Sequence, residues 1–208
     1  MIYRFAEKIV HLLSDGGAVN SENKDLLSYG LFVIINYLLY LLFTVIYGAV
    51  RHSLISCLIF YFSFCFIRAF AGGYHASSER KCFIVTVISI VFSCEAIVFF
   101  QKNHFLVPVI LTAFFALATI CVFSPIDNEQ KRLNEKEKKR FKFISVITAF
   151  VYFTCVAILY SKGVSESVSV CISLMLEATL IIVEKIKLFN KNQREGYNIG
   201  AYSAPKKH

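Results

Sequence analysis

The sequence predicts an all-α integral membrane protein with six transmembrane helices and an amphipathic helix ahead of them. Of its 208 residues, 57% are hydrophobic and only 17% are charged, whereas about a quarter of the residues in a soluble chain are charged. The apolar residues also gather into six uninterrupted segments, each close to the roughly 20 residues that a helix needs to cross a bilayer. We therefore treat residues 1–208 as a single polytopic membrane domain.

Residues 1–15 predict the amphipathic helix. Ile2, Ala6 and Ile9 recur at helical spacing, and the opposite face carries Arg4, Glu7, Lys8 and His11. This pattern is typical of a helix that lies in the membrane surface or packs on a helical bundle. The charges would also interrupt the apolar core of a signal peptide, so we expect no removable segment here.

The six predicted membrane spans follow in chain order. They are residues 28–50, 53–69, 82–100, 105–123, 141–160 and 164–183. Three of the connections between them are only a few residues long, which favours antiparallel helix pairs. We expect residues 184–208 to form a cytoplasmic tail.

The distribution of Lys and Arg predicts the orientation, because cytoplasmic flanks carry an excess of them. With the N-terminus inside, 19 of the 22 basic residues lie on the inner side, and only Arg51, Lys102 and Lys162 lie outside. Adding or removing one span would move whole basic blocks outward. We therefore expect both termini on the cytoplasmic side. The net charge of +8 then needs no nucleic-acid partner, although it can attract anionic lipids.

A short polar connection, RAFAGGYHASSERKC from Arg68 to Cys82, separates the second and third spans. Six of the seven cysteines lie within apolar segments, where a thiol usually behaves as a small hydrophobe. Cys82 differs because it begins a span directly after Arg80 and Lys81, on the predicted reducing side. The helix dipole and the two cations favour a thiolate, so we predict that Cys82 is a nucleophile.

The helix predicted after this connection places Cys82 on a polar stripe with Thr86, Ser89 and Ser93. The thiol is therefore expected to face the protein interior or a polar cavity rather than lipid. A stripe of small residues is also typical of close helix contacts in membranes, and both interpretations can hold together. Ser77 or Ser78 can cap the start of this helix.

His75 is the candidate base for Cys82. On one continuous helix the two side chains would lie about 10 Å apart along the axis, too far for a hydrogen bond. The chain must therefore bend between them, and we predict that Gly72 and Gly73 end the preceding helix and allow the bend. As metal ligands, His75 and Cys82 would supply only two of the four that zinc needs, so no metal site is predicted.

These residues resemble the accessory gene regulator B (AgrB) family of Gram-positive bacteria, membrane cysteine peptidases that process a quorum-sensing propeptide. The resemblance is carried by Arg68, Gly73, His75 and Cys82 at the family's spacing. It also includes SPIDNEQKRL, residues 124–133, which is similar to the family's Pro-Asp-Asn-rich segment; Arg132 stands where the family often has a proline. The length and the six-span layout match as well.

The resemblance implies a thiol protease of the bacterial cell membrane that needs no cofactor. Cys82 would attack a small AgrD-like propeptide with an amphipathic N-terminal part, and His75 would transfer the proton. The C-terminal tail would leave, and the thioester on Cys82 would then be displaced by a propeptide cysteine or serine, closing a thiolactone or lactone ring. The resemblance also implies a homodimer.

Other interpretations remain open at the level of sequence. Arg68 can anchor its helix at the membrane surface or bind a carboxylate of Glu79 or the substrate. Glu95 and Glu177 lie within spans, where a carboxylate is normally functional or paired, and Asn36 is a candidate partner for either. A small transporter or exporter would use these three residues to line a path. A structural subunit lipidated on Cys82 is a third possibility.

Overall fold

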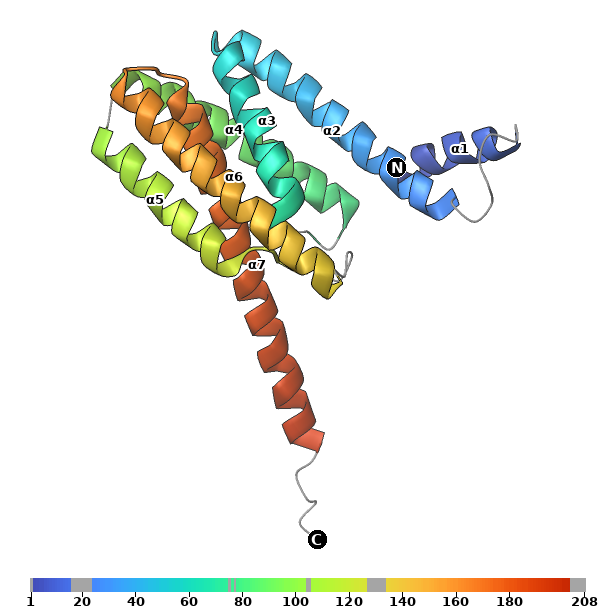
Figure 1. Ribbon diagram of the computed structural model, residues 1–208. Coiled ribbons are helices and arrows are strands. Elements are labelled where there is room, and N and C mark those ends of the chain that lie inside the picture. The colour runs from blue at the N-terminus through green and yellow to red at the C-terminus, as the bar shows by residue number, and fades with distance from the viewer. Residues whose placement is uncertain are drawn as a thin grey trace.

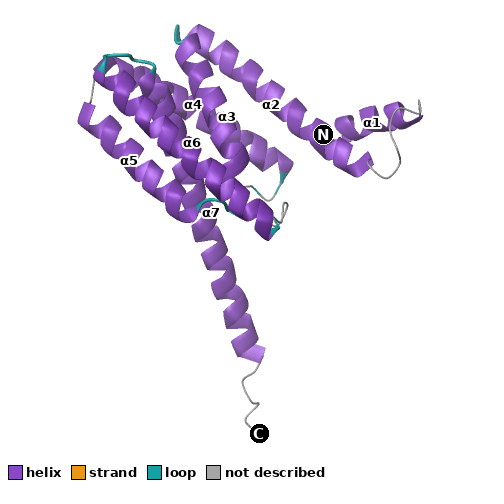
Figure 2. Cartoon of the chain, viewed as in Figure 1, coloured by secondary structure: helices purple, strands orange, loops and turns teal. Residues whose placement is uncertain are grey.

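The computed structural model describes residues 2–15, 24–74, 76, 78–103, 106–126 and 134–202, and these are helical without any strand (Figure 1, Figure 2). The helices are α1 (Ile2–Asp15), α2 (Lys24–Val50), α3 (Leu54–Ala71), α4 (Glu79–Asn103), α5 (Leu106–Phe123), α6 (Glu135–Ser161) and α7 (Ser167–Tyr202). The all-α prediction is confirmed. Two of the predicted site residues, His75 and Ser77, lie outside the described residues.

Each of the six predicted spans corresponds to one helix, from α2 to α7. Five of these helices, α2, α3, α4, α6 and α7, are long and apolar enough to cross a membrane. α5 has 18 residues, as many as α3, and its described side chains, from Val109 to Phe123, are also apolar. The predicted spans therefore correspond to the helices α2 to α7 in the same order.

Several helices extend beyond the apolar segments that predicted them. α6 begins at Glu135 because Asn134 forms a capping box: its side chain accepts a hydrogen bond from the Glu135 N–H at 2.8 Å, and the Glu137 carboxylate accepts one from the Asn134 N–H at 2.9 Å. α7 continues as helix to Tyr202, through most of the predicted tail. Hydropathy detects only the apolar part of a helix, whereas backbone hydrogen bonding continues through polar turns.

α7 is the central helix of the bundle. It packs against α3, α4, α5 and α6, and 61% of its apolar part is buried, compared with 6% for α2. One core cluster joins α3, α5, α6 and α7 through Ile67, Ile120, Ala149 and Leu174. Figure 1 shows α2 slanting away from the bundle and α7 continuing beyond it toward the C-terminus. α7 is thus placed to contact the ends of several other helices.

The amphipathic helix α1 packs against the start of α2. Ala6 and Val10 are buried, and the ring of Tyr3 meets that of Phe32 edge to face with centroids 5.7 Å apart. Phe5 is 59% exposed, so part of the apolar face remains uncovered. The helix therefore has apolar side chains both for α2 and for a membrane surface.

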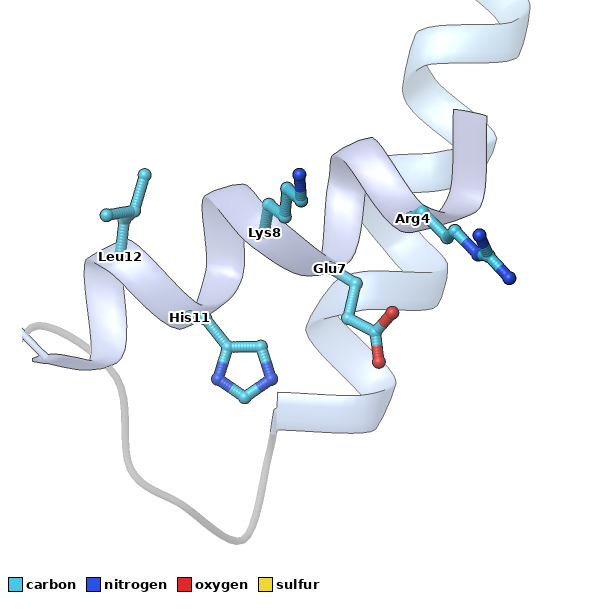
Figure 3. A pocket seen from close by; sticks show the side chains of 5 residues that line it. All are labelled: Arg4, Glu7, Lys8, His11 and Leu12. Carbon is cyan, nitrogen blue, oxygen red and sulfur yellow. The ribbon is translucent and has the colours of Figure 1, made fainter. Parts of the chain in front are cut away.

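The opposite face of α1 is polar, as the spacing predicted. Figure 3 shows five labelled side chains that project from this single helix and line a hollow along it: Arg4, Glu7, Lys8, His11 and Leu12. The four polar residues among them are all exposed. This arrangement fits a helix at the membrane surface, with its charges directed to water.

Candidate active site

The connection between α3 and α4 contains the predicted break. α3 ends at Ala71, Gly72 and Gly73 have φ values of +75° and +129°, and α4 begins only at Glu79. L-residues with side chains rarely adopt these φ values, so the glycines permit the turn. Arg68 and Cys82 therefore do not lie on one continuous helix, which was the condition for His75 and Cys82 to meet.

Position 72 also needs a glycine because another segment of the chain approaches it closely. A Cβ atom at this position would lie 2.7 Å from the carbonyl oxygen of Ile126, which follows α5. The Ile126 N–H donates to the carbonyl of Ala71 at 3.1 Å. The first residues of the SPIDNEQKRL segment thus lie against the end of α3, next to the candidate site.

Arg68 binds the backbone of the connection that follows it. Its guanidinium donates to the carbonyl oxygen of Gly72 at 2.6 Å and to that of Tyr74. It also forms an ion pair with Glu177 of α7, with Nη1 and Oε1 3.7 Å apart. Glu177 was not among the carboxylates that the sequence suggested for Arg68. The Arg68 side chain is turned inward, with 15% exposure.

α7 holds the same connection through two further contacts. The Tyr74 N–H donates to the carbonyl of Leu180 at 3.2 Å. The ammonium of Lys187 lies over the Tyr74 ring, 5.3 Å from its centroid. Arg68 and α7 thus fix the backbone on the N-terminal side of His75.

Cys82 is the fourth residue of α4, at the end of its first turn. Ser78 precedes the helix, and its hydroxyl accepts a hydrogen bond from the Lys81 N–H at 3.4 Å, while its carbonyl accepts one from the Cys82 N–H at 2.9 Å. The capping role predicted for Ser78 agrees with these contacts. Cys82 is a free, half-buried thiol, and the Thr86 hydroxyl donates to its carbonyl at 2.9 Å.

Cys82 faces a cavity of about 510 Å³ enclosed by α2, α3, α4 and α7. Thr86 and Ser89 line the cavity beside it, as their shared stripe predicted, and Arg68 lines the wall contributed by α3. Much of the remaining lining is aromatic, with Tyr29, Phe32, Tyr37, Tyr40, Tyr61 and Phe64. A cavity of this size, mostly apolar with a few polar groups, is typical of a site that binds a small molecule or a short peptide segment.

The residues on either side of His75 line the same cavity as the thiol. Tyr74 is half-buried and Ala76 is buried, and both are part of the cavity wall. The predicted base and the predicted nucleophile thus belong to segments that border one cavity. The described residues contain no group of three or more His, Cys, Asp and Glu side chains that could hold a metal ion.

The other intramembrane polar residues have separate partners. Glu95 binds Arg51, with Nε and Oε1 2.7 Å apart, and accepts a hydrogen bond from the Tyr47 hydroxyl at 2.6 Å. The amide of Asn36 donates to the carbonyl of Phe32 within α2, at 2.8 Å. Asn36 lines the cavity, whereas Glu95 and Glu177 belong to two different ion pairs. The proposed pairing of Asn36 with either carboxylate is not what the structure shows.

Sequence reasoning missed the aromatic wall of the cavity. Tyr29, Asn36 and Tyr40 share one face of α2 by helical spacing, and all three line the cavity. That polar and aromatic face on an otherwise apolar helix was a usable signal. Apolar content alone could not separate it from the lipid-facing side.

These features define a multi-pass helical membrane protein with a cysteine-bearing cavity between its helices. Comparison with known sequences identifies its family: the profile of the family described as accessory gene regulator B matches residues 6–182. The chain belongs to the AgrB family.

Its relatives are AgrB-like proteins of two bacterial genera. AgrB-like protein 2 of Clostridium perfringens (strain 13 / Type A) is 27% identical over 84% of this chain and 86% of its own length. AgrB-like protein 1 of the same strain is 31% identical over 72% and 73%. An AgrB-like protein of Lactiplantibacillus plantarum is 26% identical over 88% and 90%. No solved structure matches the chain.

Proposed function

We propose that this protein is a membrane cysteine endopeptidase that removes the C-terminal tail of a small autoinducer propeptide and allows the remaining part to cyclise. The observation that carries the proposal is the position of Cys82: a half-buried thiol near the start of α4, facing a cavity that residues 74 and 76 also line. Family membership supports a role in quorum sensing.

In the first step the Cys82 thiolate attacks a peptide carbonyl of the propeptide, and His75 takes the thiol proton. The carbon–sulfur bond forms and the peptide carbon–nitrogen bond breaks. His75 returns its proton to the departing amine, so the tail leaves as a free peptide. Backbone amides at the start of α4 are candidates for stabilising the oxyanion.

In the second step a thiol or hydroxyl of the propeptide attacks the thioester on Cys82. The new ester closes a thiolactone or lactone ring, and Cys82 regains its proton. Exchange of one thioester for another is nearly neutral in free energy, whereas hydrolysis is downhill, so the site must exclude water. The aromatic wall of the cavity is suited to that task.

The charge distribution supports a site on the cytoplasmic side, with both termini there as well. The propeptide would approach along the inner membrane surface, where the amphipathic helix α1 lies beside α2 and Tyr3 reaches the cavity wall. The partners we propose are an AgrD-like propeptide, membrane lipids and a second copy of the chain.

Co-expression with a candidate AgrD-like propeptide, followed by mass spectrometry, tests the proposal. Wild-type protein is expected to release the tail, and Cys82→Ala or His75→Ala to release none. Removal of the propeptide's own ring-forming cysteine or serine should trap a covalent adduct on Cys82.

Cys155→Ala is a matched control because it removes another accessible thiol, on α6. It should cleave like the wild type. Cleavage that persists in Cys82→Ala would overturn the proposal, as would an adduct trapped on a different cysteine.

A further inference from the structure

Glu177 is a buried ionisable group that the proposed mechanism does not use. Its side chain has no exposed surface, and within the described part of the chain neither carboxylate oxygen has a hydrogen-bond partner. A carboxylate in the middle of a membrane helix is strongly disfavoured unless another group compensates its charge. Its presence on the central helix α7 therefore requires an explanation.

The compensating charge comes from Arg68. The ion pair spans 3.7 Å between Arg68 Nη1 and Glu177 Oε1, and both side chains lie inside the bundle. The same guanidinium donates to the carbonyls of Gly72 and Tyr74. Arg68 thus connects a carboxylate on α7 to the backbone that leads to His75.

Gly73 makes this connection possible. A Cβ atom at position 73 would collide with Nη1 of Arg68 and would lie 3.5 Å from Oε1 of Glu177. The guanidinium passes directly against the glycine backbone, in space that any other residue would fill. The requirement for glycine here is therefore also a requirement of the ion pair.

We infer that Glu177 is a positioning residue, which holds Arg68 in place and through it fixes Gly72, Gly73 and Tyr74, the residues that lead to His75, relative to Cys82. The inference rests on the proposed function in one respect, that the placement of this segment controls the reaction. Without the Glu177 charge, Arg68 would be a cation in apolar surroundings, and its long side chain would turn toward the membrane surface. The two carbonyls that it binds would then be released.

The test uses the full-length protein in detergent or lipid vesicles and compares Glu177→Gln, Glu177→Asp and Glu95→Gln. The first removes the charge at constant size, the second keeps the charge, and the third breaks the other Arg–Glu pair on α4. Two kinds of measurement are made: the kinetics of propeptide cleavage, as kcat and KM, and amide hydrogen exchange of the peptide covering residues 72–82.

Glu177→Gln is expected to lower kcat by roughly 10²-fold with little change in KM, because a displacement of about 1 Å at a reacting group has effects of that size. It should also accelerate exchange at the Tyr74 amide, which bonds Leu180. Glu177→Asp should recover most of the rate, and Glu95→Gln should change neither quantity. If Glu177→Gln fails to fold, Arg68→Lys serves instead, since it leaves a cation beside Glu177 but lacks the guanidinium fork that donates to both carbonyls, and the same loss of kcat and faster exchange are expected.

Several outcomes would overturn the inference: wild-type cleavage in Glu177→Gln, unchanged hydrogen exchange in that variant, or an equal loss in Glu95→Gln. Failure of the proposed function is a distinct result. In that case the wild type itself releases no tail, and the exchange measurement alone decides whether Glu177 fixes the segment.

Discussion

Two Arg–Glu pairs in the described part of the chain differ in what surrounds them. Arg51 and Glu95 make the shorter contact, 2.7 Å, but their side chains are 42% and 44% exposed. Arg68 and Glu177 are 3.7 Å apart, with 15% and 0% exposure. The comparison shows that contact distance alone does not rank ion pairs. Burial determines how much stability is lost when one partner is removed, because a buried charge left without its partner is strongly unfavourable.

The two pairs also differ in what they hold. Glu95 on α4 binds Tyr47, on α2, and Arg51, in the turn directly after α2. Arg68 holds the carbonyls of Gly72 and Tyr74, in the non-helical connection that follows α3. Loss of the first pair removes a contact between regular helices, whereas loss of the second removes one of the supports of that connection.

The largest contrast is expected between Arg68→Ala and Arg51→Ala. Arg68→Ala leaves Glu177 buried without its partner and should destabilise the protein by about 3–5 kcal/mol. It should also lower propeptide cleavage by at least about 10²-fold. Arg51→Ala should keep near wild-type cleavage and lose less stability, because Glu95 is partly exposed and keeps the hydrogen bond from the Tyr47 hydroxyl. The midpoint of thermal unfolding in detergent measures the loss of stability, and the cleavage rate measures the loss of activity. Equal effects of the two variants would contradict the greater importance of the buried pair.

A smaller contrast is expected between Gly72→Ala and Gly163→Ala. Both glycines have φ of +75°, but a Cβ atom at Gly72 would meet Ile126, whereas at Gly163 it would meet nothing within 4 Å. Both substitutions strain the backbone, and only Gly72→Ala adds overpacking of about 1–3 kcal/mol. Thermal unfolding of the two variants isolates that difference. Identical midpoints would show that the Ile126 contact does not matter.

The smallest effect is expected for Tyr47→Phe. This change removes the hydroxyl that donates to Glu95 and leaves the Arg51 ion pair in place. Cleavage should stay within about twofold of the wild type, as for most substitutions at partly exposed sites. A kinetic assay of the purified protein measures it. A loss as large as that of Arg68→Ala would show that the two pairs are coupled through α4.

The sequence predicted the features of the site that depend on local pattern. The apolar segments indicated the helices, and Gly72 and Gly73 indicated the break after α3. Helical spacing indicated the stripe from Cys82 to Ser93, of which Thr86 and Ser89 line the cavity, whereas Ser93 is buried farther along α4. These inferences needed only neighbouring residues, so no tertiary information was required. The role of His75 stays a prediction, since it lies outside the described residues.

The partner of Arg68 could not be predicted in this way. Arg68 and Glu177 lie on helices far apart in the sequence, and their pairing depends on α7 packing against α3. Hydropathy is similar for all long apolar helices, so it does not show which helix lies at the centre of the bundle. Likewise, the contact of Ile126 with Gly72 depends on how α5 returns to the end of α3.

The position of α7 in the chain order has a consequence for biosynthesis. The segment between α3 and α4 leaves the ribosome early in synthesis. Two residues that hold it in place, Glu177 through Arg68 and Leu180 through the Tyr74 amide, belong to the last described helix. A nascent chain that inserts its helices in order holds Cys82 in the membrane well before that support exists. The proposed nucleophile is thus synthesised before the residues that position its surroundings, and under the proposed function activity would arise only when synthesis of the bundle is complete.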